Sequence, residues 1–216
     1  MRKKRKIMRK AMALLAAMLL ALGFPAIAGS AAQAQADPCT GTWSIVMGGF
    51  TLAGPGVTGE TSAYLIGDQP VGYNSADPMS GYNELNRLFW LHRSQCPADH
   101  IKIVGHSEGA GIVHAWVTNN QGAGNYNAVL LADPKRDAGP GGPGLSSTPG
   151  NQLIGYPLAG TDNWFGGVPV LEVCNHDDEI CDTSAGWYGY LFAGAHSRYD
   201  FNAYDYSNTA SGVWYR

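Results

Sequence analysis

The chain has 216 residues, of which 45% are hydrophobic and 14% charged, and its formal net charge is −3. Seven of its fourteen basic residues lie within the first ten positions, so the rest of the chain sets seven basic against seventeen acidic residues, a net charge of −10. A surface of that sign repels phosphate backbones, which excludes nucleic acid as an expected partner.

The first 36 residues are predicted to be a secretory signal peptide. A basic segment is followed by the apolar stretch 11–22 and then by an Ala-rich segment. Ala34-Gln35-Ala36 matches a small-x-small cleavage site, so we expect cleavage after Ala36 and secretion of residues 37–216 as one domain. A membrane anchor is the alternative, but the apolar stretch is shorter than the roughly 20 residues that a span needs.

Strands and helices are predicted to alternate along the remaining chain. In order, the patterns predict a strand at 43–47, a loop at 50–59, a weak strand or two fragments at 64–66 and 71–73, a helix at 83–92, a strand at 101–104, a helix at about 108–119, a strand at 128–132, a loop at 135–150 and a strand at 168–173. Residues 188–206 are aromatic and broken by glycine, and they give no clear assignment. Because the strands are continuous apolar runs, we expect an α/β three-layer sandwich with a mainly parallel central sheet.

The four cysteines are predicted to form two disulfides, as is usual in an exported chain. Three pairings are possible. Cys174 and Cys181 bracket a short loop and Cys39 and Cys96 a long one, and we predict these two pairs. A zinc site is the alternative, but the chain has no Cys-x-x-Cys pair and its Cys spacings differ widely. We expect neither a metal nor an organic cofactor.

Gly105-His106-Ser107-Glu108-Gly109 follows the apolar run 101–104 and precedes a predicted helix. Glycines two residues before and after the serine allow a sharp strand-to-helix turn that exposes the hydroxyl. Ser107 is therefore the predicted nucleophile, and the backbone N–H of Glu108, at a helix N-terminus, is a predicted oxyanion donor. A structural Gly-rich turn is the alternative.

A serine hydroxyl needs a base, usually a histidine that a carboxylate orients. Three histidines follow Ser107. His114 lies within the predicted helix, where we expect it to pack or to face solvent, and His176 lies inside the short Cys loop. His196 stands on a flexible loop after an apolar segment and is the predicted base.

The candidates for the carboxylate gather in the loop between Cys174 and Cys181 and just beyond it: Asp177, Asp178, Glu179 and Asp182. The residues alone do not choose between Asp177 and Asp178. Asp133 is a rival at the end of a predicted strand, but since Pro134 follows it, we expect it to shape its own turn.

Cys174-Asn175-His176-Asp177-Asp178-Glu179-Ile180-Cys181 resembles the Cys-Asn-x-Gly-Asp-x-Val-Cys pattern of the cutinase-like serine esterases. The chain also looks like the related hydrolase domain of mycobacterial PE and PPE proteins, and the resemblance spans roughly residues 39–200. It implies a cutinase-like α/β-hydrolase fold, both predicted disulfides, Asp178 as the orienting acid and His196 as the base. In place of the family's Arg-Gly-Ser-like turn the chain has Gly48-Gly49-Phe50-Thr51, where the N–H of Phe50 is a second predicted oxyanion donor.

The expected function is a secreted serine esterase that hydrolyses aliphatic, lipid or polyester carboxylic esters through an acyl-enzyme. One alternative is an acyltransferase with the same mechanism. The other is a non-catalytic relative that binds lipids or surfaces, which Glu108 and the altered turn at residues 48–50 motivate. The expected partners are the ester substrate and, transiently, lipid surfaces, and we expect a monomer.

Overall fold

Six parallel strands form the sheet of the described part of the chain, in the order β2-β1-β3-β4-β5-β6. The computed structural model describes residues 39, 41–50, 62–148, 155–161 and 163–216, which belong to one unit from Pro38 to Arg216. The strands are β1 (Thr42–Met47), β2 (Gln69–Pro70), β3 (His100–His106), β4 (Tyr126–Leu131), β5 (Val170–Cys174) and β6 (Gly212–Tyr215). All five pairings are parallel, which confirms the predicted α/β class and its parallel sheet.

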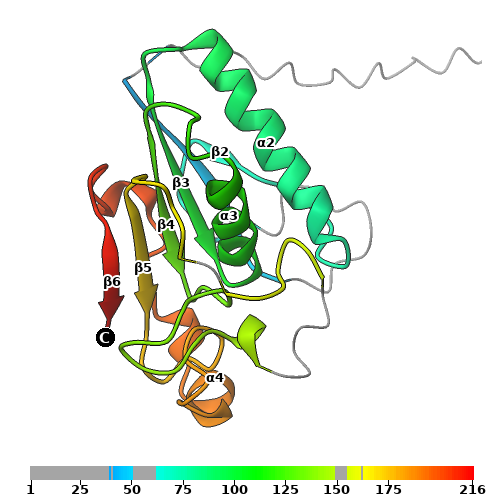
Figure 1. The fold of residues 1–216 in the computed structure, drawn as a ribbon, viewed down its shortest axis with the longest axis vertical. Helices are drawn as coiled ribbons and strands as arrows, with labels where there is room; N and C mark the ends of the chain where they lie inside the picture. The colour runs from blue at the N-terminus through cyan, green and yellow to red at the C-terminus, as the bar shows by residue number, and fades with distance from the viewer. Residues whose placement is uncertain (1–38, 40, 51–61, 149–154, 162) are drawn as a thin grey trace, which may run out of the picture. The chain divides into compact units, whose positions relative to one another are not determined.

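The register brings the carboxyl ends of the central strands to one edge of the sheet. Gly105 of β3 pairs with Met47 of β1, and His106 pairs with Leu131 of β4, which in turn pairs with Val173 of β5. The helix α4 (Trp187–Phe192) lies beyond this edge (Figure 1). Ligands of parallel sheets bind outside the carboxyl ends of the strands, so this edge is where a site is expected.

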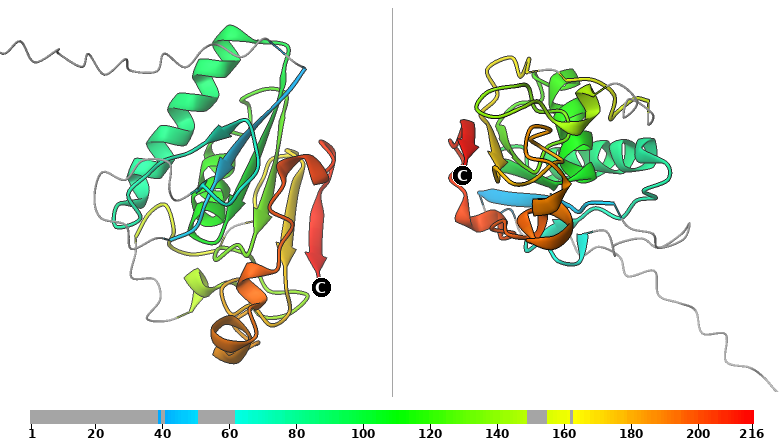
Figure 2. Two further views of the ribbon diagram at one scale, coloured as in Figure 1. Left: turned by 180° about the vertical axis from the view of Figure 1, so that it is seen from behind. Right: turned by 90° about the horizontal axis from the view of Figure 1, so that it is seen from below.

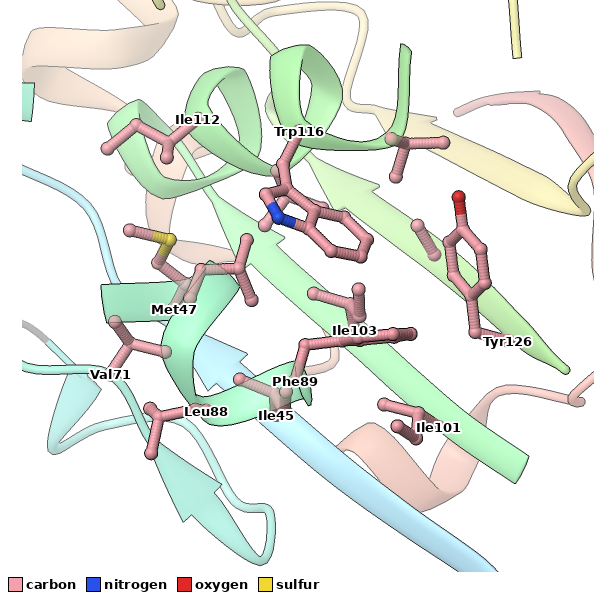
Figure 3. Close-up of a cluster of buried hydrophobic side chains, with 14 of the residues drawn as sticks. Ile45, Met47, Val71, Leu88, Phe89, Ile101, Ile103, Ile112, Trp116 and Tyr126 are labelled. Atoms are coloured by element: carbon pink, nitrogen blue, oxygen red, sulfur yellow. The ribbon is translucent and has the colours of Figure 1, made fainter. Parts of the chain in front are cut away.

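Two long helices, α2 (Pro78–Gln95) and α3 (Glu108–Asn119), cover one face of the sheet (Figure 1). In the core between them, the ring centroids of Phe89 and Trp116 lie 4.6 Å apart (Figure 3). Both side chains are fully buried, and removing a side chain of this size from water stabilises the fold by about 1.5–3 kcal/mol. This face therefore holds the larger of the two cores.

The opposite face is covered by short turns and coil, mostly from the C-terminal part of the chain. Figure 2 shows this segment crossing the sheet on the side away from α2 and α3. Tyr199, Ala203 and Tyr206 pack there on apolar side chains of β1, β3, β4 and β5. The buried ammonium of Lys102 donates to the carbonyls of Ala203 and Tyr206. The third layer of the sandwich is thus built from 3₁₀ turns, such as η5 (Ala203–Asp205), and coil.

The predicted helices and the strands predicted at 43–47, 101–104, 128–132 and 168–173 are present, most with shifted bounds, but neither fragment of the weak strand predicted at 64–66 and 71–73 forms a strand. α3 covers the predicted range, but α2 starts at Pro78 and is longer than the predicted 83–92. Its first turn has too little apolar character to show helical periodicity, although proline favours the first helical position. The second strand is the two-residue β2, while Ile66 only forms an isolated bridge with Asn202.

No expectation was stated for β6, and α4 lies almost wholly in the stretch 188–206 that had no clear assignment. β6 lies at the edge of the sheet, where Val213 is 42% and Trp214 47% exposed. With only four residues and little burial, it has neither the length nor the alternation that identifies a strand in sequence. β6 is a strand because its backbone pairs with β5.

Both predicted disulfides form, Cys39–Cys96 and Cys174–Cys181, and the described residues include no free cysteine. The predicted signal peptide, residues 1–36, and most of the predicted loop 50–59 lie outside the described residues. In the described ranges, no helix combines the length and the apolar character that crossing a membrane requires.

Candidate active site

Ser107 occupies a strained turn between β3 and α3. Its φ is +58°, in the left-handed region that a residue other than glycine rarely adopts. A Cβ on Gly105 would lie 2.7 Å from the Cα of Ala110, and one on Gly109 would lie 2.4 Å from the carbonyl oxygen of Gly48. Both glycines are therefore required by close packing, as the motif predicts. The turn lifts the serine to the carboxyl edge of the sheet.

An apolar cavity of about 370 Å³ opens beside Ser107. The apolar side chains in its wall include Phe50, Leu145, Leu158 and Ile180. These residues come from four separate segments of the chain, so only the folded protein assembles the cavity. Its volume falls in the range of small-molecule sites.

His196 and Asp178 form a hydrogen-bonded pair. His196 belongs to the turn η4 (Ala195–Ser197), and its Nδ1 lies 2.8 Å from Asp178 Oδ2 and 3.0 Å from Oδ1. Asp178 is fully buried and also accepts from the hydroxyl of Tyr199 at 2.7 Å and from the N–H of Ile180 at 3.1 Å. Acceptor bonds of this kind hold a carboxylate in place, and the pair fixes the orientation of the imidazole.

The imidazole of His196 reaches the residue next to Ser107. Its ring centroid lies 4.6 Å from that of His106, and the carbonyl oxygen of His196 lies 3.0 Å from His106 Nε2. Within the described part of the chain, no hydrogen bond joins the hydroxyl of Ser107 to His196. Catalytic hydrogen bonds are often long in the absence of substrate and tighten when it binds. The proton transfer between the two residues stays a prediction.

The other acidic candidates have different partners. Asp177 pairs with His176, with both side chains about half exposed. Asp182 accepts from Ser184, Tyr215 and the N–H of Gly142. The structure thus separates Asp177 from Asp178, a choice that the residues alone left open.

The turn after β1 lies against Ser107, where an oxyanion loop is expected. A Cβ on Gly49 would come within 2.8 Å of the Ser107 Cβ, so only glycine allows this approach. Glu108 begins α3, and the first amides of a helix have no acceptor within it. The donor roles of the Glu108 and Phe50 amides stay predictions.

The carboxyl group of Glu108 is buried and interacts with a tyrosine. Burial raises the pKa of this carboxyl to about 7. Its Oε2 lies 3.3 Å from the hydroxyl of Tyr73, which donates to the carbonyl of Gly48 at 2.8 Å. The carboxyl group of the residue after the serine therefore supports the turn at residues 48–50 through Tyr73.

His106 and Tyr64 are the residues that sequence reasoning missed. The Tyr64 hydroxyl lies 2.7 Å from His106 Nδ1 and accepts from the N–H of Gly49 at 2.6 Å. His106 stands inside the Gly-x-Ser-x-Gly motif, which was the one available signal, but Tyr64 is 42 residues away in sequence. No local pattern connects them.

Another His–Asp pair lies in the interior. His114 Nδ1 is 2.6 Å from Asp133 Oδ2, and Glu172 brings a third ligand atom, all within 4.8 Å of one another. Burial lowers the pKa of His114, but the Asp133 carboxylate outweighs it and the net shift is upward. These three residues have the chemistry of metal ligands. Asp133 Oδ1 also accepts from the N–H of Lys135. This bond closes the turn that was predicted from the position of Asp133 before Pro134.

No protein-family model matches the chain, and no curated protein does either. The similar solved structures include a cutinase-like protein from Cryptococcus sp., with 18% identity, a TM-score of 0.43 and coverage of 68% of this chain and 80% of that one. They also include a yden-like protein assigned to the hydrolases, from Pectobacterium atrosepticum, with 15% identity, a TM-score of 0.42 and coverage of 81% and 76%. The first carries the family name that the sequence resemblance suggested. Structures this dissimilar do not indicate an activity for this protein, so the functional conclusion depends on the geometry of the site.

Proposed function

We propose that the protein is a serine hydrolase that cleaves carboxylic esters through an acyl-enzyme. One observation carries the proposal: His196, paired with the buried Asp178, adjoins the left-handed turn of Ser107, beside an apolar cavity. A nucleophile, a base and the group that orients the base are the parts that acyl transfer requires.

In the proposed mechanism, Ser107 Oγ attacks the ester carbonyl while His196 Nε2 takes the hydroxyl proton. Asp178 keeps the second imidazole proton on Nδ1, so that Nε2 is the free base. The amides of Glu108 and Phe50 hold the oxyanion, each contributing about 3–4 kcal/mol at the transition state. His196 then protonates the leaving alcohol, and water repeats the sequence to release the acid.

The apolar cavity is proposed to bind the acyl chain of the ester. Its apolar wall favours an aliphatic group, because burying each methylene of the chain contributes about 0.8 kcal/mol. Phe50 lines the cavity and is 60% exposed, so the cavity is proposed to be open to solvent at this side chain. Comparing rates on p-nitrophenyl butyrate and palmitate tests this proposal, and reaction with palmitate alone would contradict an open cleft.

A fluorophosphonate probe tests the nucleophile without knowledge of the natural ester. We expect the wild-type protein to be labelled and to hydrolyse p-nitrophenyl butyrate, and Ser107→Ala to lose both properties. Ser94→Ala on the surface of α2 is the matched control and keeps both. Absence of labelling in the wild type would favour the non-catalytic alternative. Transfer of the acyl group to an added alcohol in preference to water would favour the acyltransferase.

Secretion is part of the proposal. Two disulfides are typical of proteins that fold in an oxidising compartment, and a predicted signal peptide precedes them. N-terminal sequencing of protein from the culture medium is expected to begin at Asp37. An intact N-terminus on exported protein would contradict the predicted cleavage.

A further inference from the structure

The imidazole of His106 connects two loops that meet at Ser107. Its Nδ1 faces the hydroxyl of Tyr64 at 2.7 Å, and that hydroxyl accepts the N–H of Gly49 at 2.6 Å. Its Nε2 faces the carbonyl oxygen of His196 at 3.0 Å. A single buried side chain thus lies between the turn after β1 and the turn that carries His196.

The partners determine where each proton is. A carbonyl oxygen only accepts, so His106 Nε2 must carry a hydrogen and donate it to His196. Nδ1 of the neutral ring is then bare and accepts from Tyr64, which leaves the Tyr64 oxygen free to accept from Gly49. In the series of hydrogen bonds Gly49–Tyr64–His106–His196, each donor therefore faces an acceptor.

The surroundings keep the ring neutral and fixed. Burial, together with the nearby His196, lowers the pKa of His106 to about 3. The ring of Phe201 packs edge-on against Tyr64 and His106, with centroids 5.2 and 5.0 Å away. His106 is also the last residue of β3, so the connection is anchored in the centre of the sheet.

We propose that His106 and Tyr64 are positioning residues that hold the Gly49 turn and the His196 turn in register across Ser107. The proposal rests on the proposed function, in which these turns supply an oxyanion donor and the base. Neither residue is assigned contact with the substrate. Fixing both turns in advance matters because a misplacement of about 1 Å can cost roughly 100-fold in rate.

Tyr64→Phe tests the connection, since it removes one hydroxyl and keeps the ring. We expect kcat on p-nitrophenyl butyrate to fall about 10- to 100-fold while KM changes less than about 2-fold, the split that a loss of transition-state positioning produces. Tyr126→Phe is the matched control, because that hydroxyl donates to Asn120 and lies at the amino end of β4. It is expected to retain the wild-type kcat.

His106 variants test the hydrogen bond from His106 to the carbonyl of His196. His106→Gln keeps an amide that can donate to the His196 carbonyl, so it is expected to retain more kcat than His106→Phe. Unfolding midpoints of all variants separate a positioning effect from misfolding. If either His106 variant fails to fold, Tyr64→Phe alone still decides the question.

Hydrogen exchange gives a readout that does not need a reaction. The amides of Ser197 and Arg198 are bonded within η4 and do not contact Tyr64, so faster exchange there in Tyr64→Phe supports transmission through His106. Unchanged exchange at 197 and 198 together with wild-type kcat would overturn the proposal. If the wild-type protein is neither labelled nor active, the esterase proposal fails, and exchange alone decides whether His106 holds the two turns.

Discussion

Of the four His–Asp pairs among the described residues, two join the Nδ1 of the histidine to a buried carboxylate. In His196–Asp178 the Nδ1 to carboxylate distance is 2.8 Å, and in His114–Asp133 it is 2.6 Å. The side chain of His196 is 18% exposed, whereas that of His114 is fully buried. The two pairs therefore have similar hydrogen bonds but differ in how far the histidine is exposed to solvent.

Their supports also differ. Asp178 lies in a loop that the Cys174–Cys181 disulfide closes, and His196 lies on a short turn, so the outer pair is held by loops. His114 lies on α3 and Asp133 directly follows β4, so the inner pair is held by the core. A His–Asp pair can serve catalysis only if its free nitrogen reaches a substrate, which the inner pair cannot do. Under the proposed function the outer pair therefore takes part in the reaction, and the inner pair stabilises the fold.

Asp178→Asn is expected to have the largest effect. The amide can no longer hold the His196 proton on Nδ1, so kcat should fall on the order of 10³- to 10⁴-fold, as replacing the orienting acid does in serine hydrolases. Initial rates on p-nitrophenyl butyrate measure this loss. A rate within about 10-fold of wild type would remove Asp178 from the mechanism.

Asp133→Asn should lower stability rather than activity. Removing one partner of a buried ion pair costs roughly 3–5 kcal/mol, because the other group stays buried without its counter-charge. Urea unfolding measures the free energy, and active-site titration with the fluorophosphonate probe corrects kcat for the folded fraction. If corrected kcat falls as far as in Asp178→Asn, the division between the pairs is wrong.

Replacing both Cys174 and Cys181 by serine is expected to weaken the outer pair alone. Opening so short a loop should lower the free energy of unfolding by about 2–3 kcal/mol. It should also lower kcat, because Asp178 lies inside that loop. The matched control replaces Cys39 and Cys96, which should reduce stability at least as much and leave kcat unchanged. Equal kcat in the two double variants would contradict a role for the loop in positioning Asp178.

The smallest effect is the pH dependence of stability. Burial raises the pKa of Glu172, beside the inner pair, to about 7. Between about pH 4.5 and 7 the folded state holds this proton and the unfolded state does not, so the contribution of Glu172 to stability is greatest at low pH and is lost as pH rises through 7. We expect a loss of about 1–2 kcal/mol from pH 5 to 8, measured by urea unfolding.

Glu172→Gln should flatten that pH profile, because an amide has no proton to lose. The pKa of Glu108 is also raised to about 7, so this residue contributes to the pH dependence of stability with the same sign. Comparing Glu108→Gln with Glu172→Gln shows how much of the change in unfolding free energy with pH comes from each residue. A slope that neither replacement alters would show that other groups cause it.

Local patterns predicted much of this molecule because a few signals were strong. The range 108–119 follows from a glycine-flanked serine turn and an apolar run, and the structure places α3 there. The Cys pairing followed from spacing, and the cutinase resemblance selected Asp178, which the structure places against His196. β6 was missed because its four residues are defined by their neighbour β5 rather than by their own periodicity.

Periodicity and turn chemistry are local properties, so residue patterns alone predicted most of the long strands and helices, Ser107 as the nucleophile and His196 as the base. The folded chain was needed to show that Tyr64 and His106 connect the turns around Ser107 and that His114 and Asp133 form a pair sealed from solvent. This is because hydrogen bonds and burial depend on groups brought together from distant parts of the chain. Sheet register sets these distances, and no short stretch of residues encodes it.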